Sequence, residues 1–184
     1  MNSHIIKTIC LLTVIFCSTQ SHSQIWFAKN AKVRFFSTTP IEDIEARNNY
    51  AAGAFNATTG KVYFKVMMKS FKFKKALMQE HFNENYIESD KYPSAIFEGF
   101  IEDLPDFSKS GTYNVKAKGN LTIHGVTVKK SLEVQMISDA NSIKCRSKFK
   151  VPCRDHGIKI PKVTRKNISS NIDVYLYAVF KEKK

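Results

Sequence analysis

The sequence has few residues of the kinds that interrupt regular structure. It contains only five prolines and seven glycines among 184 residues, which excludes a collagen-like repeat and argues against disorder. Leucine is scarce beside phenylalanine and valine, and aromatic and β-branched residues favour strands. With an apolar content of 43%, the chain is long enough and apolar enough for one domain with a sizeable core.

Long apolar runs are also missing. The most apolar segment, Ile9–Cys17, has nine residues, whereas a helix needs about 20 residues to cross a hydrocarbon core. Lys7 precedes this segment, and the small residues Ser21 and Ser23 follow it. This arrangement is typical of a signal peptide, and we therefore predict a signal peptide at residues 1–23, cut after Ser23.

The predicted leader sets the expected compartment and the domain boundary. We expect a periplasmic or secreted protein with a single domain at residues 24–184. A lipid anchor on Cys17 is the alternative, although the bulky Phe16 occupies a position where a small residue is expected.

Cysteines are few, and only Cys145 and Cys153 lie beyond the leader. An exported protein can form disulfides, but seven intervening residues do not match a zinc-binding spacing. Cys145 lies in an alternating segment, and an extended chain rises about 3.3 Å per residue. Unless the chain turns back, the two Cα atoms lie beyond the limit of about 7 Å for a bridge. The sequence favours two separate thiols and leaves their redox state open.

Acidic residues are outnumbered by basic ones, 16 to 29, which gives a net charge of +13. Loss of a leader with one charged residue, Lys7, leaves +12. Such a charge suits phospholipid headgroups, nucleic acid or a polyanionic glycan, or simply a soluble strand surface. Export argues against nucleic acid, so no nucleic-acid partner is expected. Four residues of one strand face should form a continuous basic stripe, which is the best candidate for an electrostatic surface: Lys144, Arg146, Lys148 and Lys150.

Most of the chain beyond the leader alternates between apolar and polar residues, with the period of two that is typical of strands. In one segment Val62, Phe64 and Val66 alternate with Lys61 and Lys65. The alternation predicts strands over residues 62–68, 97–101, 113–123, 128–136, 143–151 and 168–176, with shorter ones at 32–37, 43–47 and 51–57.

One segment breaks this rhythm. Residues 74–85, KKALMQEHFNEN, contain good helix formers without glycine or proline, which predicts a short crossover helix. One short helix cannot cover the apolar faces of so many strands, so the sheet must fold onto itself. A closed barrel does this and also removes the exposed edges. We therefore predict an all-β antiparallel barrel of about eight strands, with a two-sheet sandwich as the alternative.

Three segments resemble the YceI-like family of exported, lipid-binding β-barrels. Residues 90–97, DKYPSAIF, resemble a Lys-Tyr-Pro…Phe signature. Residues 119–127, GNLTIHGVT, match a Gly-x-Leu-Thr-Ile-His-Gly-Val-Thr motif almost residue for residue, and residues 149–158 resemble Phe-x-Ile-x-Arg-x-Asp-aromatic-Gly-Ile. The resemblance covers about residues 32–180. It implies a lipocalin-like barrel whose apolar interior holds a long-chain isoprenoid, such as a quinone or a polyprenyl phosphate, or another amphiphile.

The sequence departs from the family pattern in two places. Cys153 replaces the arginine of the third segment, with Arg154 one position later, and His156 replaces the aromatic residue. Residues 79–85 are also more polar than the family's usual run. We therefore expect the contact with a lipid headgroup and the mouth of the cavity to differ from the family pattern.

The histidines beyond the leader give no catalytic or metal-binding pattern. His81 has no second histidine one helical turn away, as a zinc-binding helix requires. His124 lies at a corner before Gly125, where we expect a turn residue that hydrogen-bonds locally. A thiol site at Cys153 and His156 would require the two side chains to face each other. With no Gly-x-Ser-x-Gly motif either, we expect no metal site, no catalytic residue and no enzyme.

The leading hypothesis is an exported protein that sequesters or transports a long-chain isoprenoid or similar amphiphile through the hydrophobic effect. We expect no cofactor other than a bound isoprenoid lipid or quinone. The alternative is a solid barrel that binds anionic membrane or glycan through the basic stripe. The sequence does not determine the oligomeric state, and a homodimer is one of the states left open. The residues expected to line a lipid cavity are Phe64, Val66, Met68, Phe97, Leu121, Ile123, Val134, Met136, Ile143 and Phe149.

Overall fold

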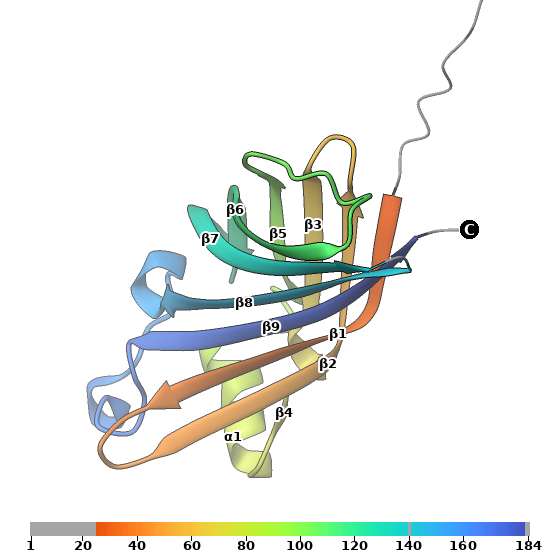
Figure 1. Ribbon diagram of the computed structural model, residues 1–184. Helices are drawn as coiled ribbons and strands as arrows, with labels where there is room; N and C mark the ends of the chain where they lie inside the picture. The colour runs from red at the N-terminus through yellow and green to blue at the C-terminus, as the bar shows by residue number, and fades with distance from the viewer. Residues whose placement is uncertain (1–24, 140, 183–184) are drawn as a thin grey trace, which may run out of the picture.

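The computed structural model describes residues 25–139 and 141–182 (Figure 1). The predicted signal peptide lies outside the described residues. Among the helices that the structure describes, none is long and apolar enough to cross a membrane.

Eight antiparallel strands form a closed barrel. Their spatial order is β1-β9-β8-β7-β6-β5-β3-β2, and pairing of β1 with β2 closes the ring. The prediction of an eight-stranded barrel is confirmed and the sandwich alternative is wrong. The strands are β1 (Ile25–Thr38), β2 (Asp43–Asn56), β3 (Lys61–Met67), β5 (Ser94–Ile101), β6 (Gly111–Ile123), β7 (Val126–Asp139), β8 (Ser142–Pro152) and β9 (Asn171–Glu182). The two-residue β4 (Lys72–Phe73) pairs with residues 46–47 of β2.

Side chains along the strands alternate between the barrel interior and solvent, as predicted. On β6, Val115, Ala117 and Leu121 are buried, while Lys116 and Lys118 are exposed. This alternation fills the interior with apolar side chains and leaves the lysines in solvent.

Two glycines allow β5 and β6 to approach closely where Gly99 pairs with Gly119. A Cβ atom on Gly99 would lie 2.3 Å from the carbonyl oxygen of Lys118, and one on Gly119 would lie 2.2 Å from that of Glu98. Neither contact is sterically allowed, so this close pairing requires glycine on both strands.

Strand β2 corrects the predicted boundaries. Residues 43–47 and 51–57 were expected to form separate strands, but β2 continues through both. The polar Asn48 interrupts the apolar pattern, yet its side chain is fully buried. Its Nδ2 donates to the carbonyl of Met67 at 2.9 Å, and its Oδ1 accepts from the amide of Tyr50 at 2.8 Å. The last strand also starts later than predicted, since Ile168 lies in the loop before β9.

Asn48 lies at an interruption of strand pairing in the barrel wall, at residues 48–51, which we call the seam. On the side away from β1, β2 pairs with β3 through residues 52–55 and with β4 through residues 46–47. Residues 48–51 have no strand partner on that side. The Asn48 side chain therefore supplies a hydrogen bond where the ladder between strands is interrupted.

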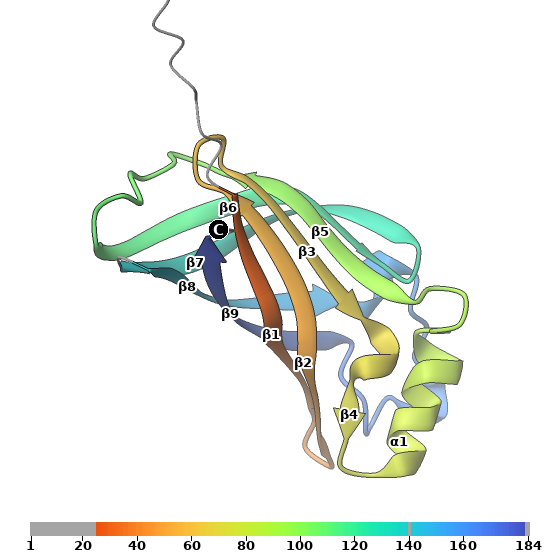
Figure 2. The same cartoon turned by 90° about the vertical axis from the view of Figure 1, so that its right-hand side faces the viewer.

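The crossover helix is confirmed. Helix α1 (Ala76–His81) continues into the π-helical turn η2 (Phe82–Tyr86), and together they lie beside the lower end of the barrel (Figure 2). Short 3₁₀ helices occur at η1 (Met68–Ser70), η3 (Cys153–His156) and η4 (Lys162–Thr164).

The half of the barrel nearer the loops 57–60 and 102–110 is solid, and we call it the filled half. Its aromatic rings meet edge to face, with Phe55 5.3 Å from Phe107 and 6.1 Å from Phe180, and with Phe64 5.7 Å from Phe180. Phe97 is also buried in this core. We call the other half, beside α1, the hollow half.

Candidate functional site

A cavity of about 460 Å³ occupies the hollow half. This volume is within the range of roughly 300–1,000 Å³ that is usual for sites binding small organic molecules. The strands β1, β2, β6, β8 and β9 contribute ten of the 27 lining residues, and all but one of the others come from residues 68–87 and 153–168. The apolar residues of the lining are Val33, Phe35, Ile44, Met68, Phe71, Phe73, Leu77, Met78, Phe82, Ile87, Leu121, Ile123, Phe149, Val151, Ile158, Ile160, Ile168, Ile172 and Val174.

Four phenylalanines form one side of the cavity. The ring of Phe35 on β1 lies 5.1 Å from Phe71, 5.7 Å from Phe73 and 5.5 Å from Phe82. Phe73 and Phe82 are 5.0 Å apart. These rings pack against one another along the wall, so they attach α1 and β4 to β1 while leaving the space beside them open.

The helical segment turns an apolar face to the cavity. Met78, Phe82 and Tyr86 recur every four residues and therefore lie on one side of the segment, and all three line the cavity. Glu80 and Glu84 are exposed. The polar composition of residues 79–85 concealed this face in the sequence, whereas the spacing of the three apolar residues would have revealed it.

Glu42 joins three segments at the rim of the cavity. It lies between β1 and β2, and its Oε1 accepts from Lys75 Nζ at 3.1 Å, just before α1. Its Oε2 accepts from Asn167 Nδ2 at 3.4 Å, in the loop before β9. The hydrogen bond from Lys75 is the main reason that the pKa of Glu42 lies below its ordinary value. The charges of Glu42 and Lys75 therefore compensate each other at the rim.

Position 153 presents a neutral group to the cavity. Cys153 is buried and lines the wall, and burial raises the pKa of its thiol to about 11. The side chain of Arg154 is 91% exposed and lies 3.4 Å from the carboxylate of Asp155. The cation that the family pattern implies at position 153 is thus absent here, and Arg154 does not replace it in the cavity wall.

The two cysteines are separate thiols, as predicted. Cys145 lies in the filled half beside Ala178 and Met136 of the neighbouring strands. Burial raises the pKa of its thiol to about 12. Both thiols therefore remain protonated at neutral pH, which makes them apolar wall and core groups rather than nucleophiles.

The structure brings four of the ten predicted lining residues to the cavity: Met68, Leu121, Ile123 and Phe149. The others pack in or against the core away from it, with Phe64, Phe97, Met136 and Ile143 buried and Val66 and Val134 partly buried. Contact of these ten residues with lipid stays a prediction. Among the aromatic and helical lining residues that were missed, Phe71, Phe73, Met78 and Phe82 lie outside the predicted strands, and Phe35 lies in a strand that was predicted to be short.

His124 is a turn residue, as predicted, but its hydrogen bonds are not local. The φ angles of His124 and Gly125 are 52° and 74°, which is the pattern of a type I′ hairpin turn. Its Nε2 lies 2.7 Å from Glu88 Oε2, and its Nδ1 lies 3.2 Å from the carbonyl oxygen of His156. Both partners are acceptors, so the ring satisfies both only when each nitrogen carries a hydrogen. The ring also packs edge to face against Tyr92 at 4.5 Å.

His156 completes this corner beneath the turn. Its side chain is fully buried, and its Nδ1–H donates to the carbonyl of Val126 at 3.0 Å. Burial is the main reason that its pKa is lowered. His124 and His156 thus fasten the hairpin to η3 and to residue Glu88, whereas His81 lies apart on α1. In residues 25–139 and 141–182 no cluster of three potential metal ligands occurs, and the expectation of no metal site stays a prediction.

The basic stripe faces outward on β8, as predicted. Its side chains contact neighbouring groups: Lys144 lies 3.6 Å from Asp139, Arg146 lies over Tyr177, and Lys148 lies over Tyr175. These contacts give three of the four cations a partner within the molecule.

The fold and the cavity define a lipocalin-like β-barrel with an apolar interior site. The model of the YceI-like domain matches residues 18–180, and this chain belongs to the YceI-like family. Among curated proteins, no significant sequence match was found.

Solved structures share the fold. A polyisoprenoid binding domain from Saccharophagus degradans implicated in plant cell wall breakdown has 13% identity and a TM-score of 0.74, and the match covers 88% of this chain and 99% of that one. Burkholderia cenocepacia BcnA has 13% identity and a TM-score of 0.69, with coverage of 81% and 95%. The Campylobacter jejuni YceI protein has 16% identity and a TM-score of 0.58, with coverage of 76% and 84%.

Proposed function

We propose that this protein binds a long-chain isoprenoid or a similar amphiphile, with the apolar chain in the cavity and the polar group near the rim. One observation carries the proposal: a closed barrel that is packed in one half encloses an apolar cavity of about 460 Å³ in the other. The polyisoprenoid-binding description of the Saccharophagus degradans neighbour supports the same class of ligand.

The physical basis is burial of the ligand's apolar surface, at about 25 cal/mol for each Å² removed from water. Met68 and Met78 give the wall side chains that adapt to the shape of a flexible chain. The helical segment of α1 and η2 covers the bound chain with its apolar face.

The part of the cavity wall that includes Glu42, Lys75 and Cys153 has no unpaired cation for a phosphate. The Glu42 carboxylate and the Lys75 ammonium compensate each other, and Cys153 is a neutral thiol. A phosphate in the cavity would lose water without gaining an unpaired cation from this wall. A quinone can be satisfied by hydrogen-bond donors such as Asn167 or Tyr86, which also line the cavity.

We also propose that the protein is exported through the predicted leader and sequesters or carries its lipid in the periplasm or outside the cell. The protein acts by binding rather than by catalysis. Cell fractionation and N-terminal sequencing test the export, since the mature chain should begin at Gln24. Recovery of full-length protein in the cytoplasm alone would contradict it.

Extraction of the purified protein with organic solvent, followed by mass spectrometry, tests the binding. We expect an isoprenoid lipid in the extract. Val174→Phe places a ring in the cavity and should reduce uptake of decyl-ubiquinone, whereas Val62→Phe adds the same volume away from the cavity and should not. If extracts of folded protein contain no lipid and Val174→Phe has no effect on uptake, the proposal fails and the surface-module alternative is favoured.

A further inference from the structure

The rim of the cavity combines exposed apolar side chains with unpaired cations. Val163 is 86% exposed, Ile41 is 62% exposed and Leu77 is 59% exposed, and these are the most exposed large aliphatic side chains of the described residues. They come from η4, from the β1–β2 connection and from α1. Three segments that surround one opening therefore each present an apolar side chain to solvent.

Basic residues accompany these apolar side chains. Residues 159–166 contain Lys159, Lys162, Arg165 and Lys166 and no acidic residue. In the part of the chain that the structure describes, none of the four takes part in an ion pair; Arg165 donates only to the carbonyl of Ile160. These cations differ in this respect from the stripe on β8, whose charges are largely engaged.

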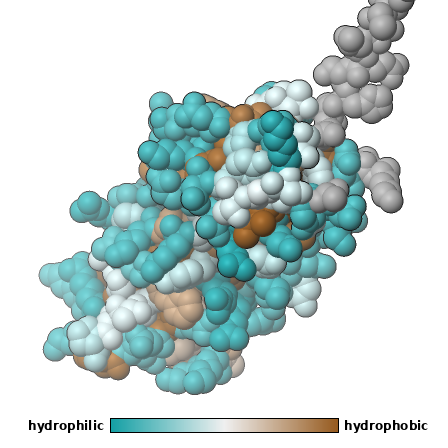
Figure 3. Space-filling model, in the orientation of Figure 1, coloured by the Kyte–Doolittle hydropathy of each residue, from teal (hydrophilic) through white to brown (hydrophobic). Residues whose placement is uncertain are grey.

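The basic segment borders the cavity directly. Ile158, Ile160 and Ile168 line both the cavity and an adjoining surface groove, which is also lined by Ile41 and the four cations. Figure 3 shows hydrophobic and hydrophilic residues side by side at this lower-left end of the molecule. The rim is thus continuous with the interior site.

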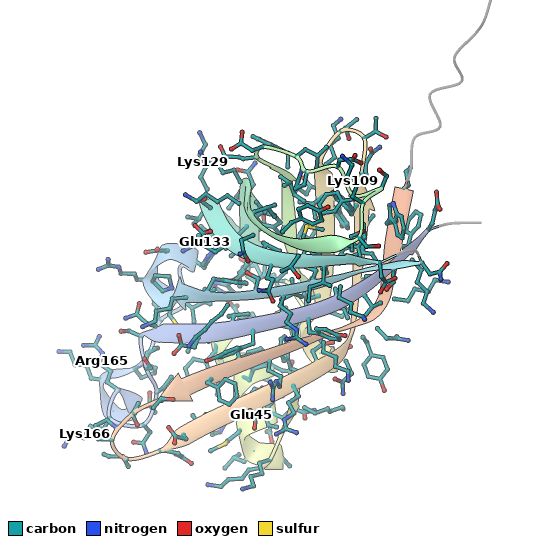
Figure 4. The ribbon with its side chains drawn as sticks, in the orientation of Figure 1. Glu45, Lys109, Lys129, Glu133, Arg165 and Lys166 are labelled. Carbon is teal, nitrogen blue, oxygen red and sulfur yellow. The ribbon has the colours of Figure 1, made fainter. Side chains whose placement is uncertain are left out.

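The opposite end of the barrel has a different charge. The loop at residues 102–110 carries Glu102, Asp103 and Asp106, of which Glu102 pairs with Lys118 and Asp106 with Lys109. Figure 4 places Lys109 at the end of the molecule far from Arg165 and Lys166. A negatively charged surface would therefore attract the cavity end more strongly than the other.

We propose that this rim docks on an anionic lipid bilayer, with the mouth of the cavity facing the membrane. Exposed apolar side chains that enter the interface, surrounded by lysine and arginine, are the arrangement that binds anionic lipids. In this orientation a lipid passes between the bilayer and the cavity without crossing bulk water. The inference rests on the proposed function for its purpose, but the docking itself is measured independently.

Flotation with vesicles of phosphatidylcholine, with and without phosphatidylglycerol, tests the proposal on protein expressed from the full sequence. We expect binding only to the anionic vesicles, weakening as salt is raised. The rim variant replaces Lys159, Lys162, Arg165 and Lys166 with glutamate. It should bind at least tenfold more weakly, because each cation near an anionic surface contributes about fivefold.

The matched control replaces the stripe residues Lys144, Arg146, Lys148 and Lys150 with glutamate, which changes the net charge equally. It should retain most of the binding. Val163→Asp should weaken binding further than Phe100→Asp, which alters an exposed apolar residue elsewhere. Equal losses in the rim and stripe variants would overturn the proposal, as would rim-dependent binding to heparin or DNA without binding to vesicles.

Lipid extraction from each variant separates the two proposals. A rim variant that keeps its bound lipid but loses vesicle binding supports docking at this surface. A wild-type protein that contains lipid but does not bind anionic vesicles overturns the docking and leaves the proposed function intact. A wild-type protein that binds vesicles through the rim but contains no lipid supports the docking and counts against the cavity function.

Discussion

The two halves of the barrel are built from the same alternating strands, yet one is packed and the other encloses a cavity. In the filled half, Phe55 meets Phe107 and Phe180 edge to face, so rings from different elements occupy the centre. In the hollow half, Phe35, Phe71 and their neighbours pack on one another along one wall. The number of phenylalanines is similar, but their arrangement decides whether space remains.

The two ends are also closed by different kinds of contact. The loop at residues 102–110 buries Phe107 in the core, and Ser138 Oγ donates to its carbonyl at 2.8 Å. Helix α1 has no buried residue of its own, and an exposed ion pair between Lys75 and Glu42 connects it to the β1–β2 connection. The loop at the filled end is therefore part of the core. At the hollow end, helix α1 covers the cavity and contacts the barrel through side chains.

The largest expected difference is in the cost of removing a ring. Phe55→Ala should lower the free energy of unfolding by about 3–5 kcal/mol, because it creates a void in a packed region. Phe73→Ala should cost less than half as much, since Phe73 already borders open space. Urea unfolding measures both, and comparable losses in the two variants would contradict the division into halves.

Removal of the lipid should affect only one half. A ligand present at a hundred times its dissociation constant stabilises the folded state by about 2.7 kcal/mol, so the delipidated protein should unfold at lower temperature. Hydrogen exchange should rise in α1 and in the residues around Glu42, but hardly at all around Phe180. Uniform loss of protection over both halves would show that the cavity is not an independent region.

The two thiols report separately on the two halves. Cys153 faces the cavity, and Cys145 faces the filled core. In the delipidated protein a thiol reagent should modify Cys153 at least about tenfold faster than Cys145, although the raised pKa of both slows the reaction. Bound lipid should protect Cys153. The variants Cys145→Ser and Cys153→Ser identify each rate, and equal rates would argue against an accessible cavity.

The smallest expected effect is the pH dependence that arises at the His156 corner. Burial lowers the pKa of His156, so below about pH 6.5 the unfolded chain binds a proton that the folded one does not. Stability should therefore fall as the pH drops through this range. His156→Asn keeps a donor for the carbonyl of Val126 and should flatten the slope.

A second loss should begin at more acidic pH. The hydrogen bond from His124 lowers the pKa of Glu88, so its stabilising contribution is present above the ordinary value for glutamate and disappears as the pH falls below it. Glu88→Gln should remove this step alone. Thermal melts from pH 7 to about pH 3 distinguish the two steps, and an unchanged profile in both variants would exclude these groups as its cause.

The sequence predicts the barrel well because strand period and closure follow from local pattern. On β6 and β8 the inward residues are those that the alternation selects. The position of the cavity does not follow from that pattern, because the same alternation produces Phe97 in a packed core and Leu121 at a cavity wall. Whether space remains depends on which side chains meet across the barrel.

The helical segment shows a second limit of prediction from the sequence. Its existence follows from composition, but the use of Met78, Phe82 and Tyr86 as a cavity wall depends on the direction in which the segment faces. Likewise, His124 was predictable as a turn residue, whereas its bonds to Glu88 and to the carbonyl of His156 join segments more than 30 residues apart. Contacts of this kind depend on the closed topology.

The seam at residues 48–51 makes one side chain part of the barrel wall. On this side of β2, main-chain ladders with β3 and β4 hold residues 52–55 and 46–47, and between them the Asn48 amide donates to the carbonyl of Met67. The wall therefore depends here on the identity of one residue, whereas a backbone ladder tolerates many side chains.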